Sequence, residues 1–274
     1  MSIGVDPRRE ICVWSPDTDV LTLLIDLASR KIGSQTRLKF LTGKAAKHRE
    51  IDVVERANAI GRAKSQGLVG FHHFTGADWG GKFVGITKKT WVEAYWKLEE
   101  DDPVVACFGQ LGNSLIRPEL VDGDLPSHVK DLEKFVCQVY SSKGEADLAT
   151  LRWELFRSRN LEGELLPPTR AALLPHIARA NYFAMRDKSY VTRLPDLPAI
   201  EESGWRIDQG VYAPVLNLVP PAPRAVIELI KCGCKTGCTG KNNLPCTPLC
   251  KCYGKQCTNM EKDTRENDED EEED

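Results

Sequence analysis

The sequence predicts an α/β fold in its first part, and two features near the start carry that prediction. The apolar run EICVWS (10–15) is typical of a short buried strand, which Pro16 ends. Residues 18–29 then space their apolar side chains as one face of a helix does. A second apolar run, TRLKFLTG (36–43), completes the strand–helix–strand order of an α/β sheet, in which ligands gather at the carboxyl ends of strands.

Further elements follow up to residue 100. Residues 51–60 have a helical pattern that Gly61 ends. We expect His72 and His73 to be neighbours on a strand, where their rings would point to opposite faces. That arrangement favours core or surface roles for the two histidines over metal binding. Thr87 is placed to cap the helix that comes next.

Several residues that could act in binding or chemistry fit the protein core better than a functional site. Trp91, Tyr95 and Trp96 suit a buried helix face more than a platform for stacking bases. The cysteines outside the C-terminal segment are expected to be inert core residues: Cys12, Cys107 and Cys137.

The middle of the chain is predicted to be mainly helical. The pattern runs over residues 101–162, and LPPTRAALLPHIARANYFAMR (166–186) predicts a further helix that Thr169 caps. Pro175 lies inside this helix and should kink or restart it. The stretch GWRIDQGVYAPVLN (204–217) predicts a hairpin with its turn at Asp208, Gln209 and Gly210.

The charge distribution separates a mildly basic body from an acidic tail. The chain has 274 residues and a net charge of −3. Residues 261–274 carry a net charge of −8, which leaves +5 on residues 1–260. This distribution suits a nucleic-acid binder that screens its own surface, and it also suits a tail that only confers solubility.

Neither a membrane span nor a secretory signal is evident in the sequence. There is no run of about 18 apolar residues, and the first residues lack the apolar stretch of a signal peptide. We therefore expect a nuclear or cytoplasmic protein without membrane contact. Its ten cysteines should then be thiols or metal ligands rather than disulfides.

Two carboxylates follow the first predicted strand. Asp17 and Asp19 lie one residue apart in SPDTDVLTLL (15–24), where both can reach a divalent cation such as Mg²⁺, which prefers oxygen ligands. Nucleases use such clusters to hold one or two Mg²⁺ ions. The alternative is a helix N-cap, in which Asp17 or Thr18 accepts hydrogen bonds from backbone N–H groups.

A glycine-rich stretch, TGADWGGKFVGITKKTW (75–91), offers a second candidate site. Its glycines permit tight turns with positive φ. Exposed amides at the start of the following helix, beside Lys88 and Lys89, would make a seat for a phosphate group. Such a seat would hold a nucleic-acid backbone without reading sequence. The alternative is an ordinary loop with solvated lysines.

These two stretches together resemble the C-terminal half of the PIN-like, flap-endonuclease-type 5′ nuclease domain. The resemblance implies a partial, Rossmann-like sheet with a helix–two-turn–helix, in which Asp17, Asp19 and Asp78 would be Mg²⁺ ligands. It assigns contact with the nucleic-acid backbone to the residues that follow: Gly81, Gly85, Lys88 and Lys89.

The chain as a whole, over residues 10–260, resembles a group of multi-copy animal proteins of mobile-element origin. They join this nuclease-like domain to a C-terminal cysteine cluster, and LPPTRAALLPHIARANYFAM and CGCK-x-GC are among the motifs they share with this chain. The nuclease family's earlier strand and acidic motif have no counterpart ahead of residue 10. The resemblance therefore implies a degenerate or incomplete nuclease.

The segment CGCKTGCTGKNNLPCTPLCKCYGKQC (232–257) is the strongest chemical signal in the sequence. Its cysteines are most simply zinc ligands, because Zn²⁺ favours tetrahedral sulfur, and disulfides are the alternative. The segment resembles the CXC domain of tesmin-like proteins with one C-x-C pair missing. Two zinc ions would be complete if one of the seven sulfurs bridges them. The expected ligands are Cys232, Cys234, Cys238, Cys246, Cys250, Cys252 and Cys257.

We therefore expect a zinc-binding, nucleic-acid-associated protein that holds DNA through its phosphate backbone. Two alternatives stay open: a Mg²⁺-dependent, structure-specific 5′ nuclease completed by a partner or by further sequence, and a non-catalytic module that binds proteins. The expected organisation is a partial nuclease-type domain (8–100), a mainly helical extension with a C-terminal hairpin (101–218), a Pro-rich linker and short helix (219–231), the zinc segment (232–260) and a disordered acidic tail (261–274).

Overall fold

The computed structural model describes residues 10–31, 36–44, 48–77, 81–119, 126–141, 147–159, 163–190 and 192–220, together with residues 246, 250, 252 and 259. Its contacts divide the chain into two units, Met1–Leu218 and Val219–Asp274. The short helix predicted after the Pro-rich linker and the predicted disordered tail lie outside the described residues.

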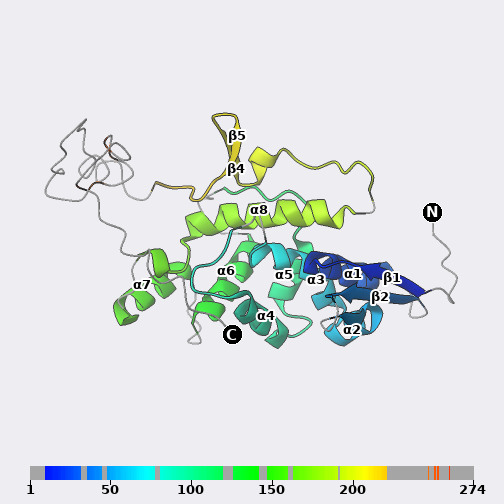
Figure 1. Cartoon of the computed structure of the whole chain (residues 1–274). Helices are drawn as coiled ribbons and strands as arrows, with labels where there is room; N and C mark the ends of the chain where they lie inside the picture. The colour runs from blue at the N-terminus through cyan, green and yellow to red at the C-terminus, as the bar shows by residue number, and fades with distance from the viewer. Residues whose placement is uncertain are drawn as a thin grey trace. The chain divides into compact units, whose positions relative to one another are not determined.

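The described residues form a mixed α/β chain, as the sequence predicts (Figure 1). No helix among them is long and apolar enough to cross a membrane. The α-helices are α1 (Thr18–Lys31), α2 (Val53–Ile60), α3 (Arg62–Phe74), α4 (Lys88–Lys97), α5 (Pro103–Gln110), α6 (Ser127–Tyr140), α7 (Leu148–Arg159) and α8 (Arg170–Lys188). The strands are β1 (Glu10–Trp14), β2 (Arg37–Thr42), β3 (Arg49–Asp52), β4 (Trp205–Asp208) and β5 (Val211–Pro214), and two 3₁₀ turns are η2 (Gly163–Leu165) and η3 (Ile200–Ser203).

The first three strands form one sheet in the order β1-β2-β3. β1 and β2 are parallel and confirm the two predicted strands, whereas β3 is antiparallel to β2 and is absent from the sequence prediction. The helix expected over residues 51–60 begins only at Val53, because Ile51 and Asp52 belong to β3. The Asp52 carboxylate accepts a hydrogen bond from the Glu55 backbone N–H at 2.9 Å and so caps α2.

β1 is a strand, but the prediction that it is buried is wrong. Ile11 is 39% exposed and Trp14 is 57% exposed. Within the described part of the chain β1 pairs only with β2, so it forms an edge of the sheet. Cys12 on this strand is exposed as well, which corrects its assignment to the core, whereas Cys107 and Cys137 are buried as expected.

α3 packs against α1, α5 and α8, and it contains both histidines that the sequence pattern places on a strand. The strand prediction for His72 and His73 is therefore wrong. Consecutive residues of a helix still point about 100° apart. His72 accordingly lies against Asp19, and His73 lies against Asp187.

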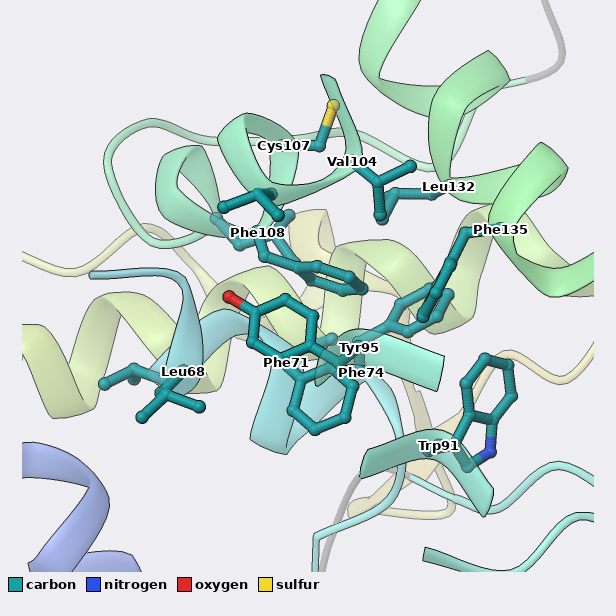
Figure 2. Packing of buried hydrophobic residues seen from close by; sticks show 14 of the residues in the cluster. Leu68, Phe71, Phe74, Trp91, Tyr95, Val104, Cys107, Phe108, Leu132 and Phe135 are labelled. Atoms are coloured by element: carbon teal, nitrogen blue, oxygen red, sulfur yellow. The ribbon is translucent and has the colours of Figure 1, made fainter. Parts of the chain in front are cut away.

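An aromatic cluster joins α3, α4, α5 and α6 (Figure 2). Phe71 stacks on Tyr95 with ring centroids 4.5 Å apart, and Phe108 packs edge-on against Phe71 at 5.5 Å. Trp91 and Tyr95 are fully buried, as predicted. Trp96 is 43% exposed, because it follows Tyr95 by one position and so leaves the buried face of α4.

α8 passes along α3 and α6 and runs through Pro175 without a break (Figure 1). Thr169 caps it as predicted, with its hydroxyl oxygen 3.2 Å from the Ala172 backbone nitrogen. Pro175 has no N–H to donate to the Ala171 carbonyl one turn earlier. The Leu218 backbone N–H donates to that carbonyl instead, at 3.0 Å, so the predicted restart of the helix does not occur.

The predicted hairpin is present. β4 and β5 are antiparallel, and the turn between them is made by Gln209 and Gly210. Both turn residues have positive φ, 50° and 82°. This is the backbone that two-residue hairpin turns need in order to match the twist of the strands.

Candidate functional site

Residues 15–17, called the acidic turn below, connect β1 to α1, and hydrogen bonds to their own side chains stabilise this turn. The Ser15 backbone N–H donates to the Leu41 carbonyl on β2 at 3.1 Å, and the Ser15 hydroxyl accepts a hydrogen bond from the Asp17 N–H at 3.1 Å. The Asp17 carboxylate then accepts from the Asp19 N–H at 3.0 Å. Asp17 therefore satisfies a backbone amide in the first turn of α1, which is the N-cap alternative to metal binding.

Asp19 lies against the C-terminal end of α3. Its Oδ1 is 3.0 Å from His72 Nε2. The Lys88 ammonium, at the start of α4, donates to the His72 carbonyl at 2.8 Å and to the Gly76 carbonyl at 3.1 Å. Asp19, a predicted Mg²⁺ ligand, and Lys88, a predicted phosphate-binding residue, thus both contact His72 at the end of α3.

Burial where α1, α3 and α4 meet shifts the pKa values of two side chains at this junction. Burial lowers the pKa of His72 to about 4, with the neighbouring Lys88 and His73 acting in the same direction. Burial also lowers the pKa of Lys88 to about 8, and the Asp19 carboxylate opposes that shift. At neutral pH the junction therefore holds a neutral imidazole and a mostly protonated lysine beside the Asp19 carboxylate.

The two predicted lysines differ in what they can do. The Lys88 ammonium already donates to the His72 carbonyl in the last turn of α3 and to the Gly76 carbonyl just after it. Lys89 is 85% exposed, and its ion pair with Glu93 spans 3.9 Å, so its charge is open to an external phosphate. Gly81 and Gly85 have positive φ, 89° and 72°, as the predicted tight turns require.

The donors at the acidic turn fit Mg²⁺ only in part. Among the described residues, no group of three or more His, Cys, Asp or Glu side chains is arranged to hold a metal ion. Asp17 and Asp19 supply two carboxylates, and the nearby Lys88 ammonium compensates part of their charge. Asp78, the third predicted ligand, lies outside the described residues.

Three of the seven predicted zinc ligands lie in the described part of the cysteine segment: Cys246, Cys250 and Cys252. Their side chains are buried, at 7%, 6% and 1% exposure. Sγ of Cys252 is 3.5 Å from Sγ of Cys246, well beyond a disulfide bond. Tetrahedral zinc with bonds of about 2.3 Å places ligand sulfurs about 3.8 Å apart, so these two sulfurs lie near the separation that a shared ion needs.

Asn259, another described residue of this segment, contacts Cys246 of the sulfur pair. Its side-chain amide donates to Cys246 Sγ at 3.6 Å, and its carbonyl accepts from the Cys246 N–H at 2.6 Å. Cys232, Cys234, Cys238 and Cys257 lie outside the described residues.

Two polar features of α8 are not predicted by the sequence. Asp187 lies 2.8 Å from His73 Nε2, and the buried Arg179 donates to the Gly204 and Val215 carbonyls. The sequence offers one signal for Arg179, which is the charged residue of a mainly apolar stretch, IARANYFA (177–184). A charged residue in such a stretch is expected to have a specific partner when buried.

No protein-family model matches the sequence, and neither the comparison with curated proteins nor that with solved structures gives a match.

Proposed function

We propose that this chain is a zinc-binding protein that associates with nucleic acid through phosphate contacts. The observation that carries the proposal is the pair of buried sulfurs of Cys246 and Cys252, 3.5 Å apart. Thiolates this close repel one another unless a cation lies between them, and zinc is the usual cation in sites made of sulfur alone. A Cys246 sulfur that also accepts a hydrogen bond from Asn259 fits such a ligand, since outer hydrogen bonds orient metal-bound groups.

The sequence of the segment supports two ions, with one of its seven sulfurs shared between them. Purified full-length chain should therefore carry zinc, and native mass spectrometry should count about two ions. Cys246→Ser and Cys252→Ser should each lower that count. Cys12→Ser, an exposed cysteine on β1, is the matched control and should leave it unchanged. A wild-type chain that binds no zinc, or variants that keep it all, would overturn the proposal.

Nucleic-acid association rests on charge and backbone geometry. The body of the chain has a net charge of +5, and Lys89 with the turns at Gly81 and Gly85 presents an open basic surface. Phosphate contacts release counterions, so retention on a DNA column should weaken steeply as salt is raised. Lys89→Ala should elute at lower salt than the wild type. Retention that does not respond to salt would instead favour the protein-binding alternative.

A Mg²⁺-dependent nuclease is the second candidate, and one observation favours it. Asp17 and Asp19 follow β1 at the carboxyl end of the parallel β1–β2 pair, the position where α/β sheets gather ligands. Asp78 would have to join them, and it lies outside the described residues. Cleavage of flapped or single-stranded DNA that needs Mg²⁺ and is lost in both Asp19→Asn and Asp78→Asn would establish this activity.

A further inference from the structure

A cavity of about 220 Å³ lies between α8 and the loop that follows the glycine-rich turn. Two basic side chains, Lys82 and Arg179, line it together with His176, and no carboxylate is among the lining residues that belong to the described part of the chain. The rest of the wall is mainly apolar: Phe83, Val84, Leu166, Pro168, Leu173 and Leu216. The cavity therefore combines two positively charged side chains with mainly apolar walls.

Arg179 is the unusual residue of this cavity, because a guanidinium is rarely buried without an acid beside it. It is only 5% exposed. Nη1 donates to the Gly204 carbonyl at 3.2 Å and to the Val215 carbonyl at 2.6 Å. Burial lowers the pKa of Arg179 to about 10, so the group stays charged at neutral pH.

The other two nitrogens of Arg179 are what a ligand would use. In the described part of the chain, Nη1 makes both hydrogen bonds of the guanidinium, and Nε and Nη2 donate none. These two nitrogens form the edge of a guanidinium whose parallel N–H groups match two oxygens of one phosphate or carboxylate. No carboxylate of the described chain occupies that edge.

We propose that this cavity is a binding site for a phosphate group, held by the Nε and Nη2 edge of Arg179 with Lys82 at the mouth. A phosphate suits the site better than a carboxylate, because Lys82 adds a second positive charge that a doubly charged group can use. The burial of Arg179 strengthens its hydrogen bonds to a bound phosphate. His176 is fixed as part of the wall, since its Nε2 donates to the Phe74 carbonyl at 2.6 Å.

The phosphate has two sources that the site itself does not distinguish. It can belong to a small phosphorylated molecule, or it can belong to a nucleic acid whose backbone also contacts the turn at Gly81. The second source deepens the proposed association with nucleic acid, whereas the first stands without it. Neither depends on zinc.

The test measures binding of inorganic phosphate to the full-length chain by calorimetry, against chloride at equal ionic strength. Lys82→Ala should weaken binding about tenfold, the loss expected for one charged hydrogen bond. Arg179→Lys keeps the charge but removes the paired N–H edge, and it should weaken binding at least as much. Lys134→Ala, an exposed lysine on α6 that does not line the cavity, is the matched control and should bind as the wild type does.

Arg179 also donates hydrogen bonds to two carbonyls, so Arg179→Lys can fail to fold. A second variant tests the proposal without changing Arg179. Val84 lines the cavity and is 46% exposed. Val84→Glu leaves Arg179 in place and adds a carboxylate to the lining of the cavity. It should abolish phosphate binding, because the carboxylate repels the phosphate and competes for the basic side chains. Displacement of phosphate by a short oligonucleotide supports the nucleic-acid source, and phosphate binding that an oligonucleotide leaves unchanged supports the small-molecule source. Absence of phosphate binding by the wild type, or undiminished binding by both Lys82→Ala and Val84→Glu, would overturn the proposal.

Discussion

His72 Nε2 lies 3.0 Å from Asp19 Oδ1, which joins the end of α3 to the start of α1. His72 is largely buried there, and burial with the nearby charges of Lys88 and His73 lowers its pKa to about 4. Its pKa in the unfolded chain is about 6.5. The folded protein therefore resists protonation of this imidazole over the interval between the two values.

This difference makes stability depend on pH with a definite sign. Between pH 6.5 and 4 the unfolded chain binds a proton at His72 and the folded chain does not. The contribution of His72 is thus fully present above pH 6.5 and is lost as pH falls towards 4. Urea unfolding should show that His72→Gln reduces the acid-induced loss of stability by up to about 3 kcal/mol. His48→Gln, an exposed histidine, should keep the wild-type slope, and an equal slope in His72→Gln would contradict the prediction.

Lys88 should matter for stability more than the neighbouring Lys89. Lys88→Met removes two hydrogen bonds from an ammonium to the His72 and Gly76 carbonyls, which leaves the end of α3 without these partners. We expect a loss of about 1–2 kcal/mol in the free energy of unfolding, near the lower end for charged hydrogen bonds because the residue is partly exposed. Lys89→Met should change it by less than about 0.5 kcal/mol. Equal effects of the two substitutions would show that the capping contacts are not stabilising.

The local elements could be predicted wherever one short pattern decides them. Thr169 and Thr87 begin their helices where the sequence places them, and Gly210 supplies the positive φ that the hairpin turn needs. These features depend on hydrogen bonds between neighbours in the chain. The strand β3 could not be predicted because the charged run REID (49–52) has no apolar pattern, and only pairing with β2 makes it a strand.

The candidate site could be predicted only in its parts. The sequence indicates that Asp17 and Asp19 follow a strand and that Lys88 begins a helix, but the partners of these residues come from α3. Because LVGFHHF (68–74) is rich in apolar and aromatic residues, its local pattern favours a strand. It is helical because α5 packs closely against it at Gly70, a tertiary contact that no local pattern reveals.

That close packing predicts opposite outcomes for two glycines. A Cβ at Gly70 on α3 would lie 2.3 Å from the Phe108 carbonyl oxygen and 2.9 Å from Leu111 Cβ. Gly70→Ala should therefore force α3 and α5 apart and cost about 2–3 kcal/mol. A Cβ at Gly109 on α5 would have no neighbouring atom within 4 Å, so Gly109→Ala should raise stability by about 0.5–1 kcal/mol through helix propensity. Thermal unfolding of the two variants checks both signs, and a stable Gly70→Ala would mean that the two helices are not in close contact.

The ion pair between Glu133 and Arg170 predicts an asymmetry between its two partners. Arg170 Nε and Nη2 lie 2.8 and 2.9 Å from the two carboxylate oxygens of Glu133, and the Leu148 N–H donates to the same carboxylate at 3.0 Å. The Glu133 side chain is 4% exposed, whereas that of Arg170 is 44% exposed. Arg170→Met leaves a buried charge without its partner and should cost about 2–3 kcal/mol. Glu133→Gln leaves an arginine that water can reach and should cost about 1–2 kcal/mol.

A double variant separates the contributions of the two partners. Glu133→Gln with Arg170→Met should be more stable than Arg170→Met alone at pH 7, because it contains no unpaired buried charge. Urea unfolding at pH 7 measures the double variant and both single variants. A double variant less stable than Arg170→Met would show that the cost arises from lost packing of the arginine stem on α8 rather than from the carboxylate.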